Sequence, residues 1–345
     1  MIRTLVSLLL ALLLAVPAQA QETPAQAAIT LYGETHAVQA ILDHELALWQ
    51  DCYTQGMRHL FVELPYYTAE LLNLWLRTGD DSIFTQIYED WEGSASHDPA
   101  VYDFYQSISD TCPETVFHGT DVGHQYGTTG ARYLEYLEAQ GLKESEAYAL
   151  TLEVIAQGRQ YYERGDEVYR ENTMVENFIR AYDALDDAPV MGIYGSAHTV
   201  LYSLDFSGQV ENMATQLAAV YGDALRTQDL SGLAVPEMEA LRTDVITVNG
   251  VEYEASYFGS ADLSMYFPAY KSRAFYRLEN AYDDFKNARV TGNVLPMDNF
   301  PMRIAAGEVF VIDYTLVDGS VEREYYRCDG TSWHGQITAL EMKIR

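Results

Sequence analysis

Residues 28–36 read Ala-Ile-Thr-Leu-Tyr-Gly-Glu-Thr-His, an apolar run that ends on a glycine, followed by a glutamate and a histidine. The apolar part predicts a buried β-strand over residues 28–32. Apolar residues then recur at helical spacing from Val38 to Tyr53, and Gly56 marks the end of that predicted helix. A buried strand followed by an amphipathic helix is the unit from which parallel sheets are built.

The same alternation continues through the first 240 residues. Apolar runs alternate with segments of helical spacing, and residues 130–186 indicate two or three further helices. We therefore predict an α/β domain over residues 21–240, whose mainly parallel central sheet is flanked by helices. The other predicted strands cover residues 59–64, 115–118 and 189–194, and the other predicted helices cover about 71–76, 101–108 and 208–221, with a polar connection at 79–99.

The pattern changes after about residue 240. Asn249-Gly250 lies between two short β-type runs and predicts a hairpin, because Asn-Gly suits a type I′ turn. Asp318-Gly319 marks a second hairpin, and a helix is predicted between the two, near residues 270–288. We expect residues 241–345 to be a β-rich region of antiparallel hairpins packed on the first domain, either extending its sheet or forming a small subdomain.

The N-terminal 20 residues predict a cleaved signal peptide. Arg3 precedes an apolar run from Leu5 to Val16, and Ala18-Gln19-Ala20 has the small residues that signal peptidase recognises. The run is short for a transmembrane helix, which needs about 20 residues. We expect cleavage after Ala20 and a secreted or periplasmic protein without a membrane span.

The chain is strongly acidic, with 51 Asp and Glu against 21 Lys and Arg and a formal net charge of −30. Such a charge repels nucleic acid, so we exclude nucleic acid as a partner and expect a small-molecule or peptide substrate. The three cysteines have spacings of neither a disulfide framework nor a zinc site. Cys52 and Cys112 each precede a predicted strand, which leaves open whether they form a disulfide in an oxidising compartment.

Polar side chains stand at the ends of the four predicted strands. Glu34 and His36 follow the first strand, and Glu63 ends the second. Asp121 follows the third, and His198 follows the fourth. Because parallel strands present their carboxyl ends at one edge of the sheet, where ligands bind, we expect these side chains to lie close together.

Two chemical roles suit this set of histidines and carboxylates. A divalent transition metal such as Mn, Co or Zn, held by His36, Glu63 and His198, would activate water. The same side chains without a metal would run acid–base hydrolysis, with one histidine as the base and a glutamate that orients it. The residues alone leave both open.

Several of these segments resemble the signature of one superfamily, which groups erythromycin esterases, ChaN-type haem-binding lipoproteins and Tiki/TraB/GumN proteins. The match spans about residues 29–205, and each motif is short. The matching segments are Gly33-Glu34-Thr35-His36, Phe61-Val62-Glu63, Gly195-Ser196-Ala197-His198 and residues 169–177, which resemble a helical Arg-x-x-x-Met-x-x-Asn pattern.

The resemblance implies an α/β fold with its site at the strand ends, and members differ between ester hydrolysis, metal-dependent peptide cleavage and haem binding. It implies that His36 and His198 are catalytic or metal-binding and that Glu34 and Glu63 are their carboxylate partners. Arg170 would bind substrate or a carboxylate, unless it forms an exposed ion pair on its own helix, and Asp121 is a second candidate for substrate binding.

We therefore expect a secreted hydrolase of an ester or peptide bond, whose His/Glu cluster activates water with or without a divalent metal. The alternative that the resemblance implies is a haem- or metal-binding uptake protein of the ChaN type.

Overall fold

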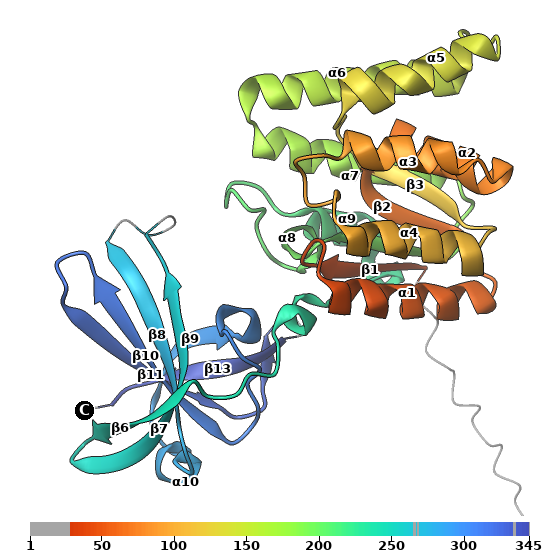
Figure 1. Cartoon of the computed structure of the whole chain (residues 1–345). Helices are drawn as coiled ribbons and strands as arrows, with labels where there is room; N and C mark the ends of the chain where they lie inside the picture. Colours follow the sequence, from red (N-terminus) through yellow and green to blue (C-terminus); the bar gives the residue numbers. More distant parts are fainter. Residues whose placement is uncertain (1–27, 265–266, 268, 334–335, 345) are drawn as a thin grey trace, which may run out of the picture.

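The computed structural model describes residues 28–264, 267, 269–333 and 336–344. The predicted signal peptide, residues 1–20, lies outside them. The described chain forms a helix-flanked sheet followed by a second, separate sheet built from the C-terminal hairpins (Figure 1). The predicted α/β class is confirmed, and the C-terminal region does not extend the first sheet.

The first sheet is parallel throughout, with strand order β3-β2-β4-β1-β5. Four of its strands are the predicted ones. The fifth was missed because its sequence, Leu-Arg-Thr-Gln-Asp, is mostly polar, as suits a strand at the edge of a sheet. The strands are β1 (Ile29–Glu34), β2 (His59–Pro65), β3 (Val116–Asp121), β4 (Val190–Gly195) and β5 (Leu225–Asp229).

Helices cover both faces of this sheet, as Figure 1 shows. Apolar residues of α1, α2, α3 and α4 pack with one face, and those of α7 and α9 pack with the other. The predicted polar connection at 79–99 contains α3, whose Phe84 and Ile87 are buried. The helices are α1 (Gln39–Thr54), α2 (Tyr66–Thr78), α3 (Asp81–Asp90), α4 (Pro99–Thr111), α5 (Ala131–Ala139), α6 (Glu146–Arg164), α7 (Glu167–Asp183), α8 (Ser196–Thr199) and α9 (Met213–Tyr221).

The second sheet follows the order β12-β13-β11-β10-β8-β7-β6, and β9 also pairs with β13. Both predicted hairpins are present, as β6–β7 and β10–β11. The predicted helix near 270–288 is wrong, because most of that segment is β8, which pairs with β7 and β10, and only a short helix, α10 (Tyr282–Phe285), follows. The strands are β6 (Arg242–Val248), β7 (Val251–Asp262), β8 (Tyr270–Leu278), β9 (Val290–Pro296), β10 (Glu308–Leu316), β11 (Val321–Cys328), β12 (Ser332–Trp333) and β13 (Gln336–Met342).

A polar contact joins the two sheets. Gln336, the first residue of β13, donates through Nε2 to the carboxylate of Asp229 at the end of β5, over 2.5 Å. The same nitrogen also donates to the hydroxyl of Ser231. The second sheet is therefore tied to the first beside the edge strand β5.

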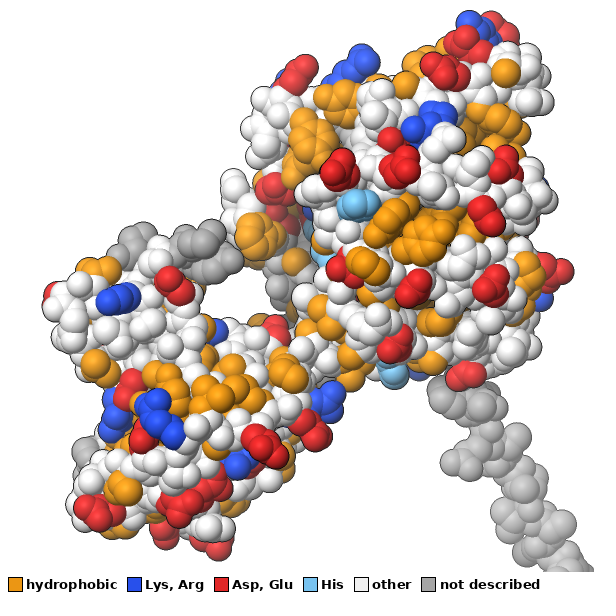
Figure 2. Space-filling model, viewed as in Figure 1, with side chains coloured by type: hydrophobic (Ala, Val, Ile, Leu, Met, Phe, Trp, Pro, Cys, Tyr) orange, Lys and Arg blue, Asp and Glu red, His pale blue; other side chains and the backbone are white. Residues whose placement is uncertain are grey.

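Cys52 and Cys112 are both free thiols in the structure, so they form no disulfide. Within the described residues, none of the helices has the length and apolarity needed to cross a bilayer. Acidic side chains are spread over the visible face of both parts of the molecule rather than gathered in one patch (Figure 2). The charge therefore points to no single docking surface on this face.

Candidate functional site

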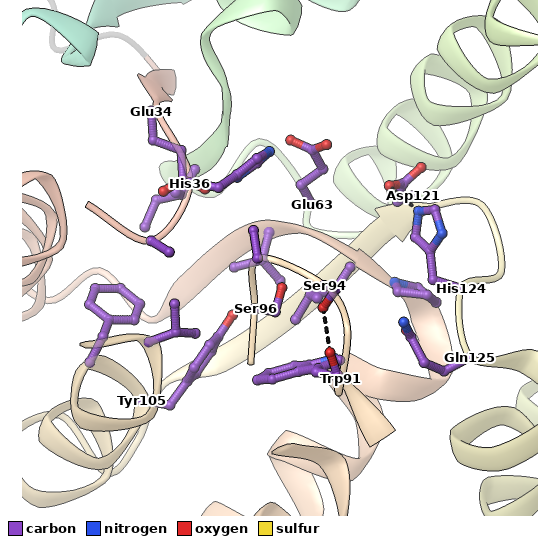
Figure 3. A pocket seen from close by; sticks show the side chains of 18 of the residues that line it. Glu34, His36, Glu63, Trp91, Ser94, Ser96, Tyr105, Asp121, His124 and Gln125 are labelled. Atoms are coloured by element: carbon purple, nitrogen blue, oxygen red, sulfur yellow. Dashed lines mark hydrogen bonds and ion pairs between the residues drawn. The ribbon is translucent and has the colours of Figure 1, made fainter. Parts of the chain in front are cut away.

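A cavity of about 300 Å³ opens at the carboxyl ends of β1 and β2. Glu34, His36 and Glu63 line one side of it, and Asp121 and His124 lie at one end, as Figure 3 shows. A neighbouring cavity of about 430 Å³ shares the first three of these residues and adds His198. The structure thus brings all the predicted site residues to one rim of the parallel sheet, where open α/β sheets bind ligands.

Glu34 and His36 form a hydrogen-bonded pair just after β1. Nδ1 of His36 lies 2.7 Å from Oε1 of Glu34. The Glu34 side chain is largely buried, whereas that of His36 is 48% exposed. The bond with Glu34 raises the pKa of His36 to about 9, with help from the charge of Glu63 and against the effect of burial. Glu34 therefore orients the ring and leaves Nε2 free to act on a ligand.

Glu63 lies at the centre of the cluster, and its side chain is 10% exposed. Its Oε1 accepts a 2.6 Å hydrogen bond from Arg170, and its Oε2 accepts one of 2.6 Å from the backbone N–H of Gly195. Nε2 of His198 lies 3.5 Å from Oε1. Burial opposes ionisation, but His198, Arg170 and His36 hold the pKa of Glu63 well below its ordinary value. Glu63 is therefore a fixed negative charge between three cationic groups.

His198, just after β4, is paired with Glu171 on α7, and its Nδ1 lies 2.6 Å from Oε2 of that carboxylate. Burial disfavours the charged ring, yet Glu63 and Glu171 together raise the pKa of His198 to about 10. Sequence reasoning missed Glu171 as a site residue, because a glutamate within a helical segment has no mark that separates a buried partner from an exposed one. Glu171 instead turns inward beneath the sheet edge.

Arg170 and Asp121 form a buried ion pair beside this centre. The Arg170 guanidinium donates to both Asp121 oxygens, over 3.1 and 2.6 Å, as well as to Glu63. Of the two alternatives for Arg170, the structure has the carboxylate-binding one rather than an exposed ion pair on its own helix. Its binding of substrate, and that of Asp121, stays a prediction.

His124 extends the network outward from Asp121. Its Nε2 lies 2.8 Å from Asp121 Oδ2, and its Nδ1 lies 2.5 Å from the hydroxyl of Tyr162. Only the proximity of His124 to Asp121 in space marks it as part of the cavity wall, because nothing in the sequence separates it from an ordinary loop histidine.

Gly195 allows the two catalytic candidates to approach each other. A methyl group on its Cα would lie 3.2 Å from Nε2 of His36 and 3.3 Å from Oε2 of Glu63, which is closer than most side chains tolerate. The glycine therefore leaves open the space beside these two polar atoms.

Glu45 on α1 is a third residue that sequence reasoning missed, after Glu171 and His124. It is fully buried, it lines the same cavity, and neither of its carboxyl oxygens has a hydrogen-bond partner among the described residues. Burial, and secondarily the charge of Glu34, raises the pKa of Glu45 to about 9. The carboxyl is therefore protonated near neutral pH, whereas in the unfolded chain it is ionised.

This difference predicts a pH-dependent cost to stability. Native Glu45 binds a proton that the unfolded chain releases above pH about 4.5, so stability falls as the pH rises from there towards 9. The cost is on the order of 3 kcal/mol at pH 7. Glu45→Gln is therefore expected to raise the urea unfolding midpoint much more at about pH 8 than at about pH 5.

The exposed Glu163 on α6 offers the matched control, because Glu163→Gln changes the same charge outside the core. It is expected to move the midpoint little at either pH. An equal effect of the Glu45 and Glu163 substitutions at both pH values would contradict the buried, protonated state of Glu45.

Within the part of the chain that the structure describes, no group of three or more His, Cys, Asp or Glu side chains has an arrangement that could hold a metal ion. The donors of the predicted site are already engaged with Arg170, with each other and with a backbone N–H. We derive no step through a metal, and the predicted Mn, Co or Zn and the alternative haem both stay predictions.

No family model matches the chain, and none of the curated proteins searched is similar to it in sequence. Similar solved structures include a Bacillus cereus protein at 12% identity, with 91% of this chain and 85% of that chain covered and a TM-score of 0.43. A succinoglycan biosynthesis protein is 10% identical over 74% of this chain and 77% of that one, with a TM-score of 0.44. An erythromycin esterase mutant in its open conformation is 11% identical over 87% of this chain and 90% of that one, with a TM-score of 0.46.

Proposed function

We propose that the protein is a secreted hydrolase that transfers an acyl group from an ester to water, with His36 as the general base. Peptide hydrolysis is the same class of reaction, so peptides are the second kind of substrate to test. The observation that carries the proposal is the Glu34–His36 pair, whose ring is held through Nδ1 while Nε2 faces the space above Gly195. A histidine oriented by a carboxylate at the wall of a cavity is the usual arrangement of a general base.

The proposed reaction needs no group beyond those of the chain and water. Nε2 of neutral His36 takes a proton from a water molecule, whose oxygen forms a bond with the ester carbonyl carbon. The tetrahedral intermediate then collapses, the bond to the alcohol oxygen breaks, and the alcohol leaves with the proton that His36 returns.

His198 and Glu63 complete the proposed machinery. The imidazolium of His198, held by Glu171, is a fixed positive charge near the place where the carbonyl oxygen becomes negative. Glu63 holds that imidazolium and Arg170 in place. In this proposal Arg170 and Asp121 are positioning residues for Glu63.

Purified protein is expected to hydrolyse members of a panel of small esters, measured as acid release at constant pH. The panel includes peptides, and each substrate is assayed with and without added Mn, Co or Zn. Hydrolysis of none of them, by protein that is folded by circular dichroism, would contradict the proposal.

The charge of His36 predicts the pH dependence of the activity. A general base must be neutral, and the pKa of His36 is about 9, so kcat/KM is expected to rise about tenfold per pH unit until the pH approaches 9. Glu34→Gln removes the bond that contributes most to this pKa, so the rising limb should move to lower pH. A limb at the same pH in both proteins would show that His36 is not the titrating base.

A further inference from the structure

The cavity has an apolar end that the proposed reaction does not use. Its wall there is made of Leu42, Val101, Phe104, Tyr105 and Trp91, all of which are buried. In Figure 3, Tyr105 and Trp91 lie on the opposite side of the pocket from His36 and Glu63. The distribution of these side chains leaves room for an apolar group of a ligand whose reacting bond lies at His36.

Polar groups without partners interrupt this apolar wall. Both carboxyl oxygens of Glu45 are covered by neighbouring side chains and lack a hydrogen-bond partner among the described residues. The hydroxyl of Tyr105 points into the pocket, and no hydrogen bond links it to another described residue. Ser96 adds a second hydroxyl to the lining.

An unpaired buried carboxyl costs stability, because it loses its hydrogen bonds to water without replacing them. Such a cost is more often found at binding sites than in a core whose only task is to pack. The cost indicates that a ligand supplies the missing partner. A glutamate side chain has enough rotatable bonds to present its carboxyl to a group that reaches this wall.

The charge state of Glu45 selects the kind of partner. Burial, together with the charge of Glu34, raises the pKa of Glu45 to about 9, so near neutral pH the group is an uncharged acid that both donates and accepts. The tyrosine and serine hydroxyls have the same dual character. Three uncharged groups of this kind suit an uncharged hydroxyl, whereas a cationic group would have to ionise Glu45 on binding.

We infer that Glu45 and Tyr105 form a specificity subsite that binds a hydroxyl group on the apolar part of the substrate. The substrate class is therefore an ester of a hydroxylated, mainly apolar alcohol or acid. This inference rests on the proposed function for the reacting bond, but the binding of the hydroxyl is independent of turnover.

Two pairs of probes that differ by one hydroxyl test the subsite. The esters are 2-phenylethyl acetate and 2-(4-hydroxyphenyl)ethyl acetate, and the ligands are the two corresponding free alcohols. Acetate release gives kcat/KM, and calorimetry gives the affinity of each alcohol. The native protein is expected to prefer the hydroxylated member of each pair by roughly ten- to a hundredfold.

Substitutions at the subsite separate its role from general packing. Glu45→Met keeps the volume and removes the hydrogen-bonding group, so the preference should vanish through weaker binding of the hydroxylated probes alone. Glu45→Gln still donates and accepts and should retain most of the preference. Tyr105→Phe, which removes one oxygen, should reduce it.

The outcomes distinguish this inference from the proposed function. Hydrolysis of both esters without a preference for the hydroxyl would overturn the subsite and leave the hydrolase intact. Preferential binding of the hydroxylated alcohol by a protein that hydrolyses neither ester nor any member of the panel would support the subsite and reject the hydrolase. A preference that survives in Glu45→Met would also overturn the subsite, and calorimetry on the native protein decides the matter if that variant fails to fold.

Discussion

Replacing His36 by alanine is expected to lower kcat/KM for ester hydrolysis by roughly 10²–10⁴-fold, the usual contribution of a general base. Nδ1 of His36 is held by Glu34, and its Nε2 lies beside Glu63 above Gly195. The two other described imidazoles near this place are less exposed and are held through both nitrogens: the side chain of His198 is 10% exposed, and that of His124 is 19% exposed. The measurement is the initial rate of acid release with the best ester of the panel.

The fold should survive this substitution, because the His36 side chain is 48% exposed. Its unfolding midpoint should therefore stay close to that of the native protein. His44→Ala is the matched control, since His44 is exposed on α1. Full activity of His36→Ala, or an equal loss in His44→Ala, would contradict the assignment of the base.

Replacing Arg170 by methionine is expected to destabilise the protein by roughly 3–5 kcal/mol, the cost of leaving one side of a buried ion pair without its partner. The guanidinium is bonded to two carboxylates, Glu63 and Asp121, whose side chains are 10% and 1% exposed. Methionine fills much of the same space, so the loss of stability measures the missing charge rather than the cost of a cavity. Urea unfolding at neutral pH measures it.

Arg180→Met is the matched control on the same helix. Arg180 pairs with Glu153 at the surface, where both side chains are about half exposed. Surface ion pairs contribute about 0–1 kcal/mol, so this variant should lose little. Equal losses in the two variants would show that the Arg170 network contributes no more than a surface pair.

The pH dependence of the Arg170→Met deficit provides a second check. In the native protein Arg170 and its histidine neighbours hold the pKa values of Glu63 and Asp121 below their ordinary values. The two ionised carboxylates therefore stabilise the native protein above about pH 4, and this stabilisation is lost as the pH falls further. Without Arg170, burial favours the protonated acids. The difference between the variant and the native protein should therefore narrow as the pH falls towards 4, and a constant difference would contradict the electrostatic explanation.

The local pattern of apolar residues was sufficient to predict most strands of the first sheet. Three of the four predicted strands, β1, β2 and β4, are apolar runs that are largely buried on both faces, and such runs stand out in any sequence that alternates them with amphipathic helices. The polar edge strand β5 and the strand β8 escaped prediction because their partners, not their own residues, make them strands.

The residues of the candidate site likewise fall into two groups, those that could be predicted from the sequence and those that could not. Glu34, His36, Glu63, Asp121 and His198 could be predicted because each lies within two or three residues of the carboxyl end of a strand, and parallel strands bring these ends to one edge. Glu171, His124 and Glu45 could not, since the sequence gives a helical glutamate or a loop histidine no mark that separates the cavity from the surface.

The sequence by itself therefore determined most of the order of strands and helices in the first domain and which strand-end polar groups share the rim of the parallel sheet, because these depend on periodicity and on the direction of the chain. Only the tertiary structure decided which groups are bonded to each other. The packing of α7 on the sheet brings Arg170 to Glu63 and Asp121 and brings Glu171 to His198, and the packing of α1 buries Glu45 without a partner among the described residues. Such pairings depend on how separate elements pack, and packing joins residues that are far apart along the chain.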